Sequence, residues 1–314
     1  MAAVVGIVVI ALSSTFILQS FEHNRQTLVI LNAGSLIIPL ETVAREFKER
    51  HPDIDIILES YGSIDCARLL VEGNRTADLL AVSDYNTITA YIFSSNLTNW
   101  YIVFATNEMV IAFTNHSKYS DEINSTNWYQ ILSRSDVSYG HSDPNRDPAG
   151  YRTLFLWKLA DIYYNADIYE SLSQDTSRKI IRPKSVELLA LLESHNIDYA
   201  FEYKSVAIQH NLSYLELPDE INLGNVSFTQ FYSKVNIVLD DGVNITAGPI
   251  LYALTIPNNA HHYTLSVDFV RFLISEDGTR LLQAANQLPV YPALTNNKSA
   301  LPQTLQPYVT EISS

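Results

Sequence analysis

The chain has 314 residues, 47% of them hydrophobic, which is enough for one large domain or two ordinary ones and too apolar for a disordered protein. It carries 20 Lys and Arg against 34 Asp and Glu, a formal charge of −14, and this excludes a broad basic surface for nucleic acid. A small anion stays open as a ligand, because backbone amide dipoles can bind locally what the net charge repels.

The N-terminal run, residues 1–21, has no charged side chain and consists mostly of Ala, Val, Ile and Leu. Such a run predicts a secretory signal peptide or a membrane anchor over residues 1–22, outside the fold. The chain has a single cysteine, Cys66, which excludes an intrachain disulfide and a cysteine-based metal cluster. Eight Asn-x-Ser/Thr sequons favour an extracytoplasmic location with N-glycans: Asn74, Asn96, Asn115, Asn124, Asn211, Asn225, Asn244 and Asn297.

A strand, a Gly-Ser turn and a helix follow one another twice near the start of the fold. The first unit is a buried strand at Thr27–Leu31, the turn Asn32–Ser35 and a helix over Ile38–Arg50. The second has a strand at Ile54–Leu58, the turn Ser60–Ser63 and a helix through Val71, and a third strand follows at Ala77–Val82. This alternation predicts an α/β fold.

The two Gly-Ser turns end successive strands, so in a parallel sheet they face the same crevice. Ser35 and Ser63 can each offer an amide and a hydroxyl there, at the start of a helix, which is a geometry that binds anions. A small polar residue before a helix is also an ordinary helix cap. Both interpretations of the turns stay open.

The middle of the chain predicts a change of sheet. Two β segments lie within Trp100–Thr114 and are joined at Thr106-Asn107-Glu108, a polar interruption typical of a hinge between two sheets. A later strand at Gly248–Ile256 returns to the first sheet. The remaining predicted elements are a strand at Val137–Gly140, helices at Asn127–Leu132, Arg152–Tyr164 and Ser185–Ser194, a strand at Ile197–Phe201, and helices at Tyr263–Ile274 and Gly278–Ala285.

The stretch Tyr139–Phe155 runs from a strand through a polar loop into a helix that we expect to be amphipathic. Pro148 and Ala149 stand in its first turn, where free N–H groups and the helix dipole favour an anion. Asp147 precedes them, a carboxylate beside the positive end of the helix. It is either a helix cap or a residue aimed at a ligand.

Other motifs point to no enzyme. There is no Gly-x-Ser-x-Gly elbow, phosphate-loop lysine motif or Gly-x-Gly-x-x-Gly. The pair His261-His262 has no acidic or histidine partner four residues on, so we interpret it as surface rather than a metal site. The segment Arg182-Pro-Lys-Ser185 suits either a phosphate contact or the cap of a helix that begins at Ser185.

Taken together, seven segments resemble the archaeal molybdate/tungstate-binding proteins of ABC importers. They occur in the family's order, and the resemblance covers nearly all of residues 27–295. The segments are Ala33–Ser35, Gly62-Ser63, Ala77–Leu79, Asp147–Arg152, Arg182–Leu189, Asp198–Tyr203 and Leu217–Asn222. The resemblance implies a two-lobed type II periplasmic-binding-protein fold, each lobe a mixed sheet flanked by helices, with two hinge strands. Lobe 1 comprises residues 27–105 plus 248–314, and lobe 2 comprises residues 106–247.

The resemblance also implies a function. A monomer outside the cell membrane, secreted or anchored by residues 1–21, captures tungstate or molybdate without catalysis and without a cofactor, and hands it to a permease with its ATPase. The ligand-binding residues that it implies are Gly34, Ser35 and Ser63 from lobe 1 and Asp147, Pro148, Ala149, Glu202 and Glu220 from lobe 2. Asp147 and Glu202 are implied to approach the tungsten or molybdenum atom itself.

Physical chemistry supports that role for the two carboxylates. The oxygens of a divalent oxoanion are best met by neutral N–H and O–H donors, and a carboxylate nearby is repelled. It becomes favourable only by bonding the highly charged metal centre, as hard oxygen ligands do. Sulfate and phosphate offer no such centre, so Asp147 and Glu202 would reject them.

Three other interpretations remain. The first is a binding protein of the same fold for sulfate, phosphate or a carboxylate, which the two carboxylates disfavour. The second is an enzyme that uses Asp147 and Glu202 as general acid and base. The third is a sensor that works through a membrane partner. For the transport protein, we expect the lobes to close about hinges near Ala105–Glu108 and Ala247–Pro249.

Overall fold

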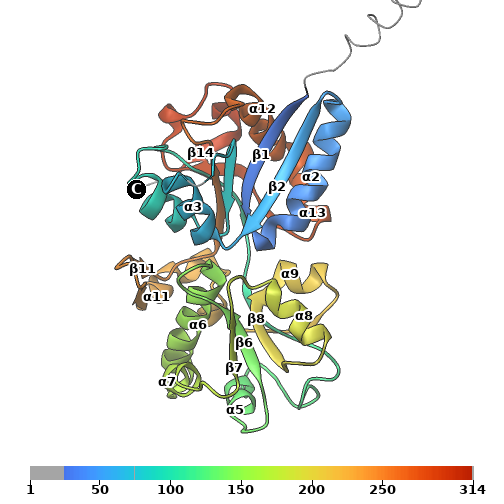
Figure 1. Cartoon of the computed structure of the whole chain (residues 1–314). Coiled ribbons are helices and arrows are strands. Elements are labelled where there is room, and N and C mark those ends of the chain that lie inside the picture. Colours follow the sequence, from blue (N-terminus) through green and yellow to red (C-terminus); the bar gives the residue numbers. More distant parts are fainter. Residues whose placement is uncertain (1–24, 74, 313–314) are drawn as a thin grey trace, which may run out of the picture.

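The computed structural model describes residues 25–73 and 75–312, and it has two sheets flanked by helices, one above the other in Figure 1. This is the predicted α/β, two-lobed class. The predicted signal peptide or anchor at residues 1–22 lies outside the described residues. Within the described part of the chain, no helix combines the length and the apolar character needed to cross a membrane.

The sheet of lobe 1 has seven strands in the order β14-β13-β4-β12-β3-β1-β2. β1 pairs in parallel with β2 and β3, whereas β12 is antiparallel to β3 and β4, so the sheet is mixed. Its strands are β1 (Gln26–Ala33), β2 (Ile54–Tyr61), β3 (Leu79–Val82), β4 (Ile102–Thr106), β12 (Leu251–Thr255), β13 (Leu288–Thr295) and β14 (Val309–Glu311). Its helical elements are η2 (Gly34–Leu36), α2 (Ile37–Arg50), α3 (Ser63–Val71), α4 (Tyr85–Thr87), η3 (Ile88–Ile92), α12 (Tyr263–Leu273), α13 (Glu276–Ala284), η5 (Lys298–Ala300) and η6 (Gln306–Tyr308).

The sheet of lobe 2 has five strands in the order β7-β6-β8-β5-β9. They are β5 (Met109–Phe113), β6 (Tyr139–Ser142), β7 (Lys179–Arg182), β8 (Tyr199–Tyr203) and β9 (Ser213–Glu216). The helices are α5 (Trp128–Leu132), α6 (Pro148–Tyr164), α7 (Ile168–Ser173), α8 (Glu187–Glu193), α9 (Lys204–Gln209), α10 (Asp219–Asn222), η4 (Val226–Phe228) and α11 (Thr229–Tyr232). A separate hairpin is formed by β10 (Asn236–Val238) and β11 (Asn244–Thr246), which lies beside the junction of the lobes in Figure 1.

The chain crosses between the sheets twice. It leaves the seven-stranded sheet after Thr106 and enters the five-stranded sheet at Met109, so the crossing is Asn107-Glu108. It returns to the seven-stranded sheet by way of the separate hairpin, between Thr246 at the end of β11 and Leu251 at the start of β12. Both crossings are where polar or Gly-Pro sequence interrupts a β segment, because a strand that serves two sheets must break its hydrogen-bond ladder between them.

The predicted amphipathic character of α6 is wrong. Every residue from Pro148 to Thr153 is buried, the charged Arg152 included, because the first turns of this helix are covered on more than the sheet side. The close packing depends on Gly150, where an added Cβ would lie 2.3 Å from the carbonyl oxygen of Ser142. The helix start is therefore pressed against the end of β6, and this positions the candidate site.

Candidate functional site

Asp147 lies at the N-terminal end of α6, and both of its carboxylate oxygens accept backbone hydrogen bonds. The Ala149 N–H donates to Oδ1 at 3.4 Å and the Ser185 N–H donates to Oδ2 at 2.8 Å. Burial raises the pKa of Asp147 to about 6, although these amides, the Ser142 hydroxyl and Arg152 act in the opposite direction. The carboxylate thus caps the helix and also faces the interior between the lobes.

Ser185 is not the helix cap that the sequence predicted. The helix α8 begins at Glu187, and no side chain caps it. The amide of Ser185 instead binds Asp147, which the sequence could not indicate because the two residues are 38 positions apart. The prediction of a helix cap at this serine is wrong, since no side chain caps α8. The phosphate contact stays a prediction.

Glu202 lies within β8 and is fully buried. Its Oε1 accepts the Tyr203 N–H at 2.7 Å, whereas Oε2 has no hydrogen-bond partner among the described residues. Burial raises the pKa of Glu202 to about 8; the Tyr203 amide opposes this shift, the charge of Asp147 adds to it, and the Ser185 hydroxyl opposes it. The two carboxyl groups therefore interact electrostatically in a buried environment. One oxygen of Glu202 is left there without a hydrogen-bond partner among the described residues.

The lobe 1 side presents hydroxyl groups. Ser35, in the turn η2, is 5% exposed, and its Oγ accepts a hydrogen bond from the Tyr252 hydroxyl at 3.0 Å. Ser63, the first residue of α3, is fully buried. Its Oγ accepts the Ser83 N–H at 3.1 Å and lies 3.1 Å from the Ser83 hydroxyl.

The two turns of lobe 1 touch the polar loops of lobe 2. An added Cβ at Gly34 would lie 3.1 Å from Val186 Cγ2, and one at Gly62 would lie 2.3 Å from the Arg146 carbonyl oxygen and 3.3 Å from Asp147 Cβ. The Ile64 N–H donates to that same carbonyl at 3.1 Å. The structure thus packs the turns that carry Gly34, Ser35 and Ser63 against the loops that carry Val186 and Asp147–Ala149. Glu202 lies within electrostatic reach of Asp147.

Sequence reasoning missed Arg152, which joins the lobes. It is 2% exposed and donates to the Ser83 carbonyl at 2.8 Å and to the Tyr203 hydroxyl at 2.7 Å. It also forms an ion pair with Asp84 at 3.0 Å. An arginine on a helix is normally expected at the surface. The available signal in the sequence was its position one turn after Pro148, on the same face of the helix.

Glu220 is not brought to this cluster. It lies in α10, partly exposed. Burial chiefly raises the pKa of Tyr164, and the charge of Glu220 is among those that add to it. Tyr164 ends the 17-residue helix that Asp147 caps, and such a helix is about 25 Å long. Among the described residues, no hydrogen bond or ion pair joins Glu220 to Asp147 or Glu202; its charge acts on Tyr164 and Tyr232 instead.

A pocket of about 340 Å³ lies between the lobes next to the cluster, lined mainly by Gly34, Ile37 and Ile38 of lobe 1 and Val186, Leu189 and Val206 of lobe 2. No group of three or more His, Cys, Asp or Glu side chains in the described ranges could hold a metal ion. His262 of the predicted surface pair binds Asp78, with its N–H 2.7 Å from Oδ1. The arrangement can bind a small anion with hydroxyl donors on one side and two carboxyl groups on the other.

Comparisons with known proteins show which proteins the chain resembles. Residues 28–285 match the family described as bacterial extracellular solute-binding protein. An uncharacterized solute-binding protein of Petrotoga mobilis is 42% identical over 288 residues, covering 90% of this chain and 89% of the relative. The molybdate/tungstate-binding protein WtpA of Pyrococcus abyssi is 42% identical over 288 residues, covering 83% of each. The periplasmic molybdate-binding protein of Azotobacter vinelandii has a TM-score of 0.63 at 12% identity, covering 83% of this chain and 98% of that one, a likeness of fold alone.

Proposed function

Because this chain belongs to the family of bacterial extracellular solute-binding proteins, we propose that it captures tungstate or molybdate between its lobes and delivers it to an ABC transporter. The family is one of binding proteins, so we set the enzyme interpretation aside. The observation that carries the choice of ligand is the pair Asp147 and Glu202, buried together opposite the hydroxyls of Ser35 and Ser63.

The hydroxyl side suits the oxygens of the ligand. A tetrahedral dianion carries many lone pairs and no hydrogen, so it needs donors only. Ser35 and Ser63 provide O–H groups, and the helix start beside Gly34 provides N–H groups. The Ala149 N–H would be shared with Asp147 Oδ1, to which it donates here. This half of the site would bind sulfate as well as tungstate, because both ions present similar oxygens.

The two carboxyl groups determine which anion binds. A carboxylate 4 Å from a unit negative charge is repelled by about 4 kcal/mol at an effective dielectric constant of 20. That repulsion is offset only where a carboxylate oxygen bonds the metal atom, which a large, highly charged centre permits. Sulfur and phosphorus in their tetrahedral oxoanions offer no open position. Asp147, and Glu202 once it gives up the proton that burial favours, thus bind tungstate or molybdate and reject sulfate, phosphate and carboxylates.

The lobes are expected to move about the two crossings. We assign residues 27–105 plus 248–314 to lobe 1 and residues 106–247 to lobe 2, with hinges at Asn107-Glu108 and near Gly248. The family acts outside the cytoplasm; beyond that we propose a monomer, anchored or released according to the fate of residues 1–22, that docks on a permease with its ATPase. The exposed sequon asparagines Asn96, Asn115, Asn124, Asn211 and Asn244 can accept N-glycans.

Calorimetric titration of the full chain with tungstate, molybdate and sulfate tests the function. The wild type should bind the first two and not sulfate. Asp147→Ala and Glu202→Ala should each weaken tungstate binding by about 30-fold or more, roughly 2 kcal/mol, and should bind sulfate better than the wild type does. Sulfate binding by the wild type as tight as tungstate binding would favour a general anion-binding protein. Unchanged tungstate affinity and sulfate rejection in both variants would overturn the carboxylate role.

A further inference from the structure

A chain of buried hydrogen bonds connects the first crossing between the lobes to Ser35. It starts at Asn107, which is 8% exposed. Its Oδ1 accepts the Glu108 N–H at 3.0 Å and the Ser205 N–H at 3.3 Å. A backbone N–H can only donate, so these two contacts fix which end of the amide is oxygen. The Asn107 Nδ2 group is therefore held as a donor.

Because the Nδ2 group can only donate, it fixes the direction of the hydrogen bond that it makes with Tyr252. It donates to the Ser205 hydroxyl at 2.7 Å and to the Tyr252 hydroxyl oxygen at 3.2 Å. Tyr252 lies in β12 and is fully buried, so its own O–H also requires an acceptor. An amide NH₂ cannot accept, and within the described chain the remaining contact of this hydroxyl is Ser35 Oγ at 3.0 Å. The Tyr252 hydroxyl therefore donates its hydrogen bond to Ser35 Oγ.

Ser35 is the last residue in this series of hydrogen bonds, and its Oγ already accepts a hydrogen bond from the Tyr252 hydroxyl. Its own hydroxyl proton has no acceptor among the described residues, although the side chain is 5% exposed. A hydroxyl that accepts one hydrogen bond becomes a better donor of the next, because successive bonds polarise one another. The geometry thus leaves Ser35 with one free donor and no competing orientation.

We propose that Asn107 and Tyr252 are positioning residues that fix the Ser35 hydroxyl as a donor to the bound oxoanion. The inference rests on the proposed function, since it takes Ser35 as a ligand contact. A donor-only hydroxyl suits the bare oxygens of tungstate or molybdate.

The hydrogen bonds that run from Asn107 through Tyr252 to Ser35, called the relay below, also lie at a place in the fold that suits this role. Asn107 stands in the crossing, Ser205 belongs to α9 of lobe 2, and Tyr252 and Ser35 belong to lobe 1. The donor orientation of Ser35 therefore depends on how the crossing sits between both lobes. No residue of the relay is charged, so it adds no like charge beside the anion.

The test is a double-mutant cycle of Tyr252→Phe and Ser35→Ala, read by calorimetry with tungstate. Phenylalanine removes one oxygen and keeps the ring, which leaves the Ser35 hydroxyl free to turn. We expect about tenfold weaker binding in Tyr252→Phe and no further loss when it is added to Ser35→Ala. Tyr139→Phe is the matched control, because Tyr139 is fully buried in lobe 2 and donates to the Leu172 carbonyl at 2.9 Å. It should leave tungstate affinity unchanged.

Each outcome separates the relay from the function on which it rests. If Ser35→Ala weakens binding and Tyr252→Phe does not, the relay is overturned while the proposed function stands. An equal loss from Tyr252→Phe in both backgrounds also overturns it, because Tyr252 would then act without Ser35. Asn107→Ala, a second variant, should weaken binding by less than tenfold and only where Ser35 is present. If the wild type binds no tungstate, the proposed function fails and the relay with it.

Discussion

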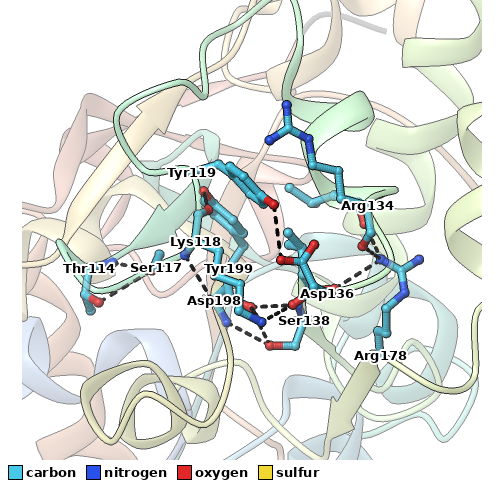
Figure 2. Close-up of polar contacts among 12 residues, drawn as sticks. Thr114, Ser117, Lys118, Tyr119, Arg134, Asp136, Ser138, Arg178, Asp198 and Tyr199 are labelled. Atoms are coloured by element: carbon cyan, nitrogen blue, oxygen red, sulfur yellow. Dashed lines mark hydrogen bonds and ion pairs between the residues drawn. The ribbon is translucent and has the colours of Figure 1, made fainter.

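Two polar clusters lie at opposite ends of the same strands, β6 and β8. The distal cluster, drawn in Figure 2, surrounds Asp198 and Ser138, which precede the two strands. Asp198 accepts the Ser138 N–H and hydroxyl, each at 2.8 Å, and the Lys118 N–H at 3.1 Å. Nearby, the Arg178 guanidinium donates to the carbonyls of Leu132, Arg134 and Val137. Lobe 2 provides every one of these partners.

The cleft cluster, Asp147 and Glu202 with their neighbours, lies at the other end of β8. The hydrogen-bonding groups of Glu202 are not all satisfied by lobe 2. Glu202 lies four residues after Asp198, yet one of its oxygens accepts a single amide and the other has no partner among the described residues. Its neighbourhood is closed by the opposite lobe, through the contact of Ile64 with Arg146 and of Asp84 with Arg152. A folded chain normally satisfies its buried carboxyl groups, so a cluster left incomplete marks a place for a ligand.

The largest effect is expected from preventing the lobes from meeting. In Gly62→Ala the new Cβ would lie 2.3 Å from the Arg146 carbonyl oxygen, a backbone atom that cannot rotate away. The φ of Gly62 is −63°, so alanine brings no strain of its own and the clash acts only between the lobes. We expect tungstate affinity to fall at least about 100-fold, close to 3 kcal/mol, by calorimetry.

The matched control for that variant is Gly248→Ala. It lies in the second crossing, and an added Cβ there meets nothing within 4 Å, so affinity should stay at the wild-type value. Solution scattering should show that tungstate shrinks the radius of gyration of the control and of the wild type, and not of Gly62→Ala. Tight binding by Gly62→Ala would show that the cleft cluster does not need the other lobe.

The second prediction exchanges the two carboxyl groups for amides and reads stability without ligand. Asp198→Asn replaces an acceptor of three hydrogen bonds with a group that is half donor, so we expect the free energy of unfolding to fall by about 3 kcal/mol. Glu202→Gln removes a carboxyl group whose ionised form is disfavoured by burial and should not lower stability at pH 8. Urea unfolding measures both.

Tungstate affinity should give the reverse order, with a loss in Glu202→Gln and none in Asp198→Asn. A destabilised Glu202→Gln protein that still binds tungstate normally would mean that the two ends of β8 do not differ in role.

The sequence predicted the elements whose pattern is local. The periodic apolar residues and Gly-Ser turns of β1–α2 and β2–α3 led to an α/β fold, and the polar interruption at Asn107-Glu108 led to the crossing. β13 (Leu288–Thr295) was missed because Pro289 and Pro292 argue against a strand. The hairpin strands β10 and β11 have three residues each, too few for a periodicity to be visible.

The candidate site was predictable where a motif carried it and not where contacts joined distant segments. Ser35, Ser63 and Asp147 stand at turns before helices, which is a signal in one segment. The binding of Ser185 to Asp147, of Arg152 to Asp84, and of Tyr252 to Ser35 joins residues 38 to 217 positions apart. Their roles follow from burial and from which hydrogen-bond partners remain, and neither can be read along the chain.

The last predicted effect is a pH dependence of stability at the cleft end. The folded protein holds the pKa of Glu202 at about 8, above its ordinary value of 4.5. Between these values the unfolded chain releases the proton and the folded chain keeps it. The contribution of Glu202 is thus fully present below about pH 4.5 and is lost as the pH rises through about 8. Glutamine does not titrate.

The melting temperature of Glu202→Gln minus that of the wild type should therefore increase from pH 5 to pH 8, by about 3 °C or more, and level off above. Differential scanning calorimetry without oxoanion, at constant ionic strength, measures it. Asp147 is present in both proteins, so its own raised pKa largely cancels in the difference. A difference that stays constant over this range would mean that Glu202 is already ionised in the folded, ligand-free protein. The cleft end of β8 would then hold two buried negative charges beside Arg152. It would differ less from the distal end, where Asp198 is fully hydrogen-bonded, than the unpaired oxygen of Glu202 indicates.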